Sequence, residues 1–191
     1  MYVNAQRLFP GLTAADVRAK HAAGVCSSFT MDWLKKKAAG KMVNGATYTV
    51  NNGSWNHTSR LNKIVARQKN YEKSGDLAVE AKSYGLLYTH LKNFGGSFGG
   101  DLAEAFAAYD LTLAAGLYYL SFQMDRGEGH AIGYDKRAME FCDANEGIYR
   151  FNGQDASYLV AEVRQFMLEE LEEVCNVVTI GEVSLRPRGW C

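Results

Sequence analysis

Apolar and polar positions change their spacing along the chain, and the change divides it into two parts. In the first part apolar residues recur every three or four positions, the spacing of amphipathic helices. In the second part short runs of strand-forming residues alternate with turn residues. The predicted helices cover 13–22, 26–40, 60–71, 76–92, 101–109 and 155–174, and the predicted strands cover 116–122, 129–134, 139–143, 148–151 and 177–185.

This order of elements indicates an α+β fold, with helices first and an antiparallel sheet with one late helix after them. Residues 44–58 are rich in Asn, Gly and Thr and predict a loop, and residues 93–100 predict a second, glycine-rich loop. The chain shows no repeat and no internal linker. We therefore expect a single domain spanning residues 1–191.

Two of the predicted strands form a hairpin that brings a histidine to a carboxylate. The polar residues 135–138 separate the runs, so pairing Tyr134 with Met139 is the simplest register. In that register His130 lies directly opposite Asp143 on one face of the sheet, with Cβ atoms about 4.5–5.5 Å apart. The hairpin therefore predicts an imidazole held by a carboxylate.

A nucleophile for such an imidazole stands at Cys26, where a helix is predicted to begin. A thiol attacks only as thiolate, and both a helix N-terminus and a neighbouring imidazolium favour the thiolate. Asp143 would fix the tautomer of His130, the role of the third member of a catalytic triad. The sequence thus predicts amide hydrolysis through a thioester, with the backbone N–H of Cys26 as one oxyanion donor.

Each of these residues also has a structural interpretation. Cysteines on helices are often small core residues, strand histidines are usually structural, and Asp143 could serve only the turn that follows it. Gly129 and Gly133 beside His130 indicate, however, a backbone that another element approaches closely. The order of an early helix-start cysteine and a late His/Asp hairpin is more specific than any one member.

Other residues are weaker candidates for the same roles. His21 is the alternative base, and Asn145 shares a face with Asp143 and is the alternative residue to orient His130. The second oxyanion donor stays open between Asn4 and Gln6. His57 and His90 are expected in a loop and at a helix end, and Cys142 is expected in the core.

Composition narrows the class of protein without pointing to a ligand. The 191 residues are 47% hydrophobic, and 21 basic side chains balance 21 acidic ones, so nothing favours nucleic acid or an anionic membrane. The longest apolar run, 111–122, is too short to span a bilayer, and the first residues do not form a secretory signal. Four dispersed cysteines indicate a reduced compartment. No residues have the spacing of zinc ligands, and we expect no metal or cofactor.

Three islands of the sequence resemble the YopT-type cysteine proteases, a papain-like branch of bacterial effectors. Residues 24–29, with Trp33 seven positions after Cys26, resemble the family's nucleophile helix. Residues 117–122 and 129–133 resemble its strand and histidine segment. Residues 141–151 resemble its acid segment, although Ala144 replaces the usual proline.

The resemblance implies a papain-like fold with a Cys26, His130 and Asp143 triad. It also implies an effector that acts on a host or competitor protein and reaches the target cell by a signal-independent route, being otherwise cytoplasmic. The expected activity is a cysteine peptidase with a protein or peptide substrate. Deamidation of Gln or Asn side chains and peptidoglycan amide cleavage by the same triad are alternatives, and a non-catalytic binding domain is a third. The sequence leaves the oligomeric state open.

Overall fold

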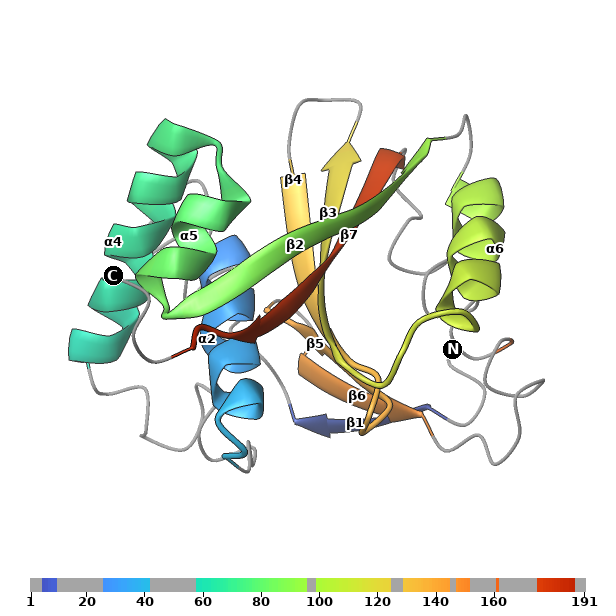
Figure 1. Ribbon diagram of the computed structural model, residues 1–191, viewed down its shortest axis with the longest axis horizontal. Helices are drawn as coiled ribbons and strands as arrows, with labels where there is room; N and C mark the ends of the chain where they lie inside the picture. Colours follow the sequence, from blue (N-terminus) through green and yellow to red (C-terminus); the bar gives the residue numbers. More distant parts are fainter. Residues whose placement is uncertain are drawn as a thin grey trace.

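An antiparallel sheet forms the centre of the molecule in the computed structural model (Figure 1). The structure describes residues 5–9, 26–41, 58–95, 99–124, 129–144, 147–151, 161 and 175–187. Within these residues the sheet has seven strands in the order β1-β6-β5-β4-β3-β7-β2. The strands are β1 (Ala5–Phe9), β2 (Leu86–Gly95), β3 (Leu117–Met124), β4 (Gly129–Asp135), β5 (Glu140–Asp143), β6 (Gly147–Phe151) and β7 (Cys175–Leu185).

Helices lie on both sides of this sheet (Figure 1). The helices are α2 (Cys26–Ala38), α4 (Thr58–Ser74), α5 (Leu77–Ser83) and α6 (Gly99–Asp110). In the figure α2, α4 and α5 gather at one side and α6 stands at the other. The α+β fold expected from the sequence, with the cysteine on a helix and the His/Asp pair on an antiparallel sheet, is confirmed.

Alternation along the strands divides the core into two clusters, one on each face of the sheet. Tyr119 of β3 and Ala131 of β4 belong to the cluster that contains Trp33 of α2. The residues next to them, Leu120 and Ile132, belong to the cluster formed with α6. Because successive strand side chains point to opposite faces, β3 and β4 contribute to both cores and are buried on both sides.

The main error in the predicted elements concerns residues 84–92. The helix expected over 76–92 ends at Ser83, Gly85 adopts a left-handed φ of +74°, and Leu86 begins β2. β2 is the last strand in the sheet order, and most of its middle residues are exposed. A mostly exposed strand shows little two-residue alternation, so its pattern does not exclude a helix.

The other predicted elements within the described residues are confirmed with small shifts of their ends, including the helices at 26–40, 60–71 and 101–109. Strand β1 was not predicted. The predicted helix 13–22, nearly all of the loop 44–58 and nearly all of the helix 155–174 lie outside the described residues.

Candidate active site

Cys26 is the first residue of α2, as the sequence predicts. Its side chain is half-buried, and its Sγ lies 3.9 Å from the carbonyl oxygen of Gly129, at the start of β4. The first N–H groups of a helix lack partners within the helix and carry the positive end of its dipole. The sulfur therefore lies at the positive end of the α2 dipole.

Helix α2 reaches this position because it packs closely against β4. The indole of Trp33 lies over Gly133, where a Cβ atom would come within 2.7 Å of the ring. The Thr30 hydroxyl donates a 3.1 Å hydrogen bond to the carbonyl oxygen of Ala131. The close approach predicted around His130 is thus present at Gly133, and it sets the distance between helix and strand.

His130 and Asp143 contact each other within the hairpin. The Nε2 atom of His130, on β4, forms a hydrogen bond and ion pair with Oδ2 of Asp143, on β5. The side chain of Asp143 is 1% exposed and that of His130 is 15% exposed. Phe122, the cross-strand partner of His130, stacks on the imidazole with the ring planes 18° apart. The ring is therefore fixed both in its plane and at one nitrogen.

The register that brings the pair together differs from the predicted one. Tyr134 pairs with Phe141 instead of Met139, so Asp143 lies opposite Ile132 and is diagonal to His130. The turn takes up the extra residues, and Met139 closes it with a left-handed φ of 53°. A shift of two residues keeps every side chain on its face, and diagonal neighbours remain within reach of long side chains. The predicted contact between His130 and Asp143 is therefore present, although the predicted register is wrong.

The surroundings of His130 favour the imidazolium. Burial by itself lowers the pKa of His130, but the charge and the hydrogen bond of Asp143, together with the nearby Cys26 thiol, outweigh burial. The pKa of His130 is therefore raised well above its usual value of 6.5. Since a carboxylate only accepts, Nε2 carries the hydrogen of the bond to Asp143, and Nδ1 is the ring nitrogen that Asp143 does not bind.

The structure describes only some of the weaker candidates. His21, His57, Asn4 and Asn145 lie outside the described residues. His90 lies on β2 instead of at a helix end, and its side chain is exposed. Cys142 is buried in the core beneath α2, as expected, and burial raises the pKa of its thiol well above the usual range.

A buried carboxylate close to Cys26 was not predicted. Glu80 of α5 is 3% exposed and accepts hydrogen bonds from the hydroxyls of Ser27 and Ser28, the two residues after the cysteine. The sequence signal for such a partner is the adjacent pair of serines, Ser27 and Ser28. On a helix whose first turn faces the core, both hydroxyls require buried partners.

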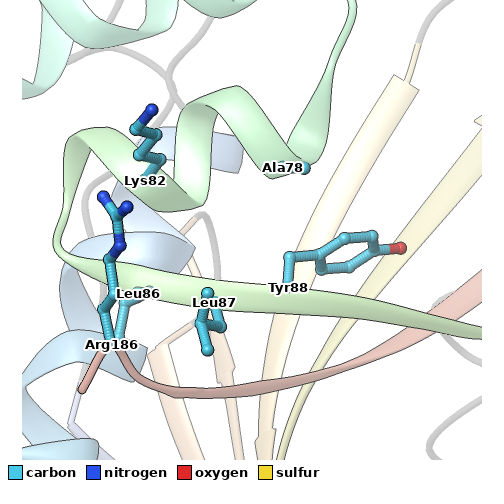
Figure 2. A pocket seen from close by; sticks show the side chains of 6 residues that line it. All are labelled: Ala78, Lys82, Leu86, Leu87, Tyr88 and Arg186. Carbon is cyan, nitrogen blue, oxygen red and sulfur yellow. The ribbon is translucent and has the colours of Figure 1, made fainter. Parts of the chain in front are cut away.

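A small hollow of about 150 Å³ lies elsewhere on the surface, beside α5 and the start of β2 (Figure 2). Its lining comprises Ala78, Lys82, Leu86, Leu87, Tyr88 and Arg186. In the sheet, the row of His130 continues through Phe122 and Val178 to Phe94, near the other end of β2. The hollow is therefore separate from the group formed by Cys26, His130 and Asp143.

Comparison with known proteins gives a match to the Pseudomonas avirulence protein AvrPphB. The TM-score is 0.63, and the match covers 92% of this chain and 97% of that one at 15% sequence identity. The chain has a papain-like fold. At this identity the match shows the fold alone, and at that level it confirms the resemblance to the YopT-type proteases. No protein-family model and no curated protein sequence matches the chain.

The candidate site offers a thiol next to an imidazole that can carry a proton. Among the described residues, no three His, Cys, Asp or Glu side chains are grouped so that they could hold a metal ion. None of the described helices is long and apolar enough to cross a membrane. The chemical groups at the candidate site are the Cys26 thiol, the His130 imidazole and the buried Asp143 carboxylate.

Proposed function

We propose that this protein is a cysteine peptidase in which Cys26 is the nucleophile, His130 the acid and base, and Asp143 the residue that orients His130. One observation carries the proposal. A cysteine at the first position of a helix lies close enough to an imidazole to influence its protonation, and that imidazole is bound to a buried carboxylate. This arrangement has the roles of a catalytic triad, with the papain-like fold as its setting.

The reaction follows from the ion pair of thiolate and imidazolium. The Cys26 sulfur attacks the amide carbonyl, a C–S bond forms, and the carbonyl π electrons move to oxygen. The imidazolium of His130 gives its proton to the leaving nitrogen as the C–N bond breaks, which leaves a thioester. Neutral His130 then takes a proton from water, and the resulting hydroxide displaces the thiolate. The N–H of Cys26 would stabilise the oxyanion in both steps.

The protein substrate and the effector role are supported by the comparison. AvrPphB is described as an avirulence protein of Pseudomonas. We extend this to the present chain as the proposal that it acts, as an effector, on a protein of another cell. The same triad can hydrolyse side-chain amides, so the nature of the bond is decided by product analysis.

Labelling with an epoxysuccinyl inhibitor tests the proposal. The wild-type protein should be labelled at Cys26 at neutral pH, and Cys26→Ala should not be labelled there. His130→Ala should react at least about 100-fold more slowly, because the ring supplies both the ion pair and the proton for the opening epoxide. His90→Ala is the matched control and should react like the wild type, since that side chain is exposed on β2.

Full-rate labelling of His130→Ala would overturn the proposed triad. The intact masses of candidate protein targets, measured after incubation with the protein, then show whether a backbone amide or a side-chain amide is hydrolysed. Peptidase activity yields fragments, whereas deamidation leaves an uncut chain with a small gain in mass.

A further inference from the structure

A buried carboxylate that the triad does not use lies beneath the first turn of α2. The two oxygens of Glu80 each accept a hydrogen bond of 2.5 Å, from the hydroxyls of Ser27 and Ser28. The Ser27 oxygen is also 2.7 Å from the hydroxyl of Tyr119 on β3. All four side chains are at most 3% exposed. Glu80 therefore joins the turn that carries Cys26 to α5 and to the sheet.

The count of protons in this network favours an ionised Glu80. Ser27, Ser28 and Tyr119 each bring one O–H, and the network contains three bonds. With a carboxylate, both serines donate to Glu80 and Tyr119 donates to Ser27, so every proton has one acceptor. A protonated Glu80 would bring a fourth proton to three bonds. Burial raises the pKa of Glu80 above its usual value, although the two serine hydrogen bonds offset part of this rise.

Two further bonds fix the same turn from other directions. The backbone N–H of Ser28 donates to Oε1 of Gln68 on α4 at 3.1 Å. The hydroxyl of Tyr84, after α5, donates to the carbonyl oxygen of Ser28 at 2.8 Å. An N–H in a first helical turn has no partner within the helix, so Gln68 satisfies a group that would otherwise be unpaired. The turn is held from α4, α5 and β3 together.

We propose that Glu80 is a positioning residue: as a carboxylate, it holds the serines that follow Cys26 and thereby fixes the sulfur against the ring of His130. The inference rests on the proposed function, because it concerns the same nucleophile. Glu80 touches neither the substrate nor the reacting atoms. It acts through Ser27 and Ser28, and misplacing a nucleophile by about 1 Å can cost about 100-fold in rate.

The charge of Glu80 gives the proposal a second consequence. The charge lies close to two phenols, those of Tyr71 on α4 and Tyr119 on β3, and raises the pKa of both. A shorter side chain that keeps the carboxylate should therefore preserve more of the network than a neutral amide does.

Two reagents separate positioning from thiolate formation. Iodoacetamide needs only the thiolate, which displaces iodide as the C–S bond forms. With an epoxysuccinyl inhibitor the thiolate opens the C–O bond and the new alkoxide takes the proton of His130, so the rate also requires a correctly placed ring. The ratio of the two second-order rate constants at Cys26, measured by peptide mass spectrometry, reports the positioning.

The variants are Glu80→Gln, Glu80→Asp and, as a control, Glu104→Gln, whose side chain is exposed on α6. For Glu80→Gln we expect the epoxide-to-iodoacetamide ratio to fall at least about fivefold. Glu80→Asp keeps the carboxylate, so its ratio should lie between those of the wild type and Glu80→Gln. Glu104→Gln should match the wild type.

A Glu80→Gln ratio equal to that of the control would overturn the positioning role, whatever happens to the melting temperature. A Glu80→Asp ratio no higher than that of Glu80→Gln would overturn the role of the ionised carboxylate. If the wild type and His130→Ala opened the epoxide equally fast, the proposed function itself would fail. If only the triad variants slowed and Glu80→Gln kept its ratio, only this inference would fail.

Discussion

At the scale of single residues, the contact between His130 and Asp143 is the feature that the hydrophobic pattern predicts best. Both residues were assigned to one face of a hairpin, and the structure joins them there. The register could not be predicted, because it depends on Met139 adopting a left-handed φ of 53°. Methionine rarely adopts that conformation, so local sequence favours a shorter turn. The face was predictable because it follows from the two-residue period of a strand alone.

The same contact predicts how stability depends on pH. Asp143→Asn should lower the free energy of unfolding by about 2 kcal/mol between about pH 5 and 6.5. The pKa of His130 is higher in the folded protein than its unfolded value of 6.5, so the folded state binds the proton more tightly. This stabilisation is complete below pH 6.5 and is lost as pH rises through the folded pKa. Urea unfolding of both proteins across pH measures the difference, and a difference that grows with pH above 6.5 would contradict the account.

Gly133 sets the spacing between α2 and β4. Gly133→Ala should destabilise the protein by about 1–3 kcal/mol, because the new Cβ would come within 2.7 Å of the rigid Trp33 ring. It should also slow epoxide labelling of Cys26, since α2 would move away from β4. Gly95→Ala is the control, since nothing lies within 4 Å of a Cβ there and its stability should be nearly unchanged. Equal urea midpoints for the two variants would argue against this role of Gly133.

At the scale of elements, the short helix α5 is the part that the sequence predicts least well. Its start was correctly placed at Asp76, but its end was not, because β2 follows after only Tyr84 and Gly85. Helix propensity and an exposed strand give similar patterns over such short stretches. The consequence for the site is that Glu80 could not be placed beneath Cys26, since its position depends on how α5 packs.

The cap of α5 provides a test at this scale. The Asp76 side chain accepts hydrogen bonds from the backbone N–H groups of Ala78 and Val79, at 2.8 and 3.3 Å. Asp76→Ala should lower the free energy of unfolding by about 1 kcal/mol, whereas Asp76→Asn, which can still cap, should change it little. Thermal or urea unfolding distinguishes the two. If both variants lost the same stability, the loss would come from the charge and not from the cap.

At the scale of the whole molecule, the candidate site joins segments about a hundred residues apart. Cys26 comes from a helix on one face of the sheet, while His130 and Asp143 share the face of Ile132, which packs with α6. The meeting is possible because Cys26 lies at the beginning of its helix and His130 beside the first residue of β4. Sequence periodicity assigns each partner to its element. It does not say where the elements cross, and that information comes from the packing of Trp33 on Gly133.

The central claim is that Cys26, His130 and Asp143 act as one unit of charge and proton transfer. Nitrogen NMR of the imidazole of His130, in the wild type and in Cys26→Ala, measures this most directly. The account predicts a doubly protonated ring in the wild type at about pH 7.5, above the usual histidine pKa, and a titration that moves to lower pH when the thiol is removed. A ring that titrates near 6.5 in both proteins would contradict it.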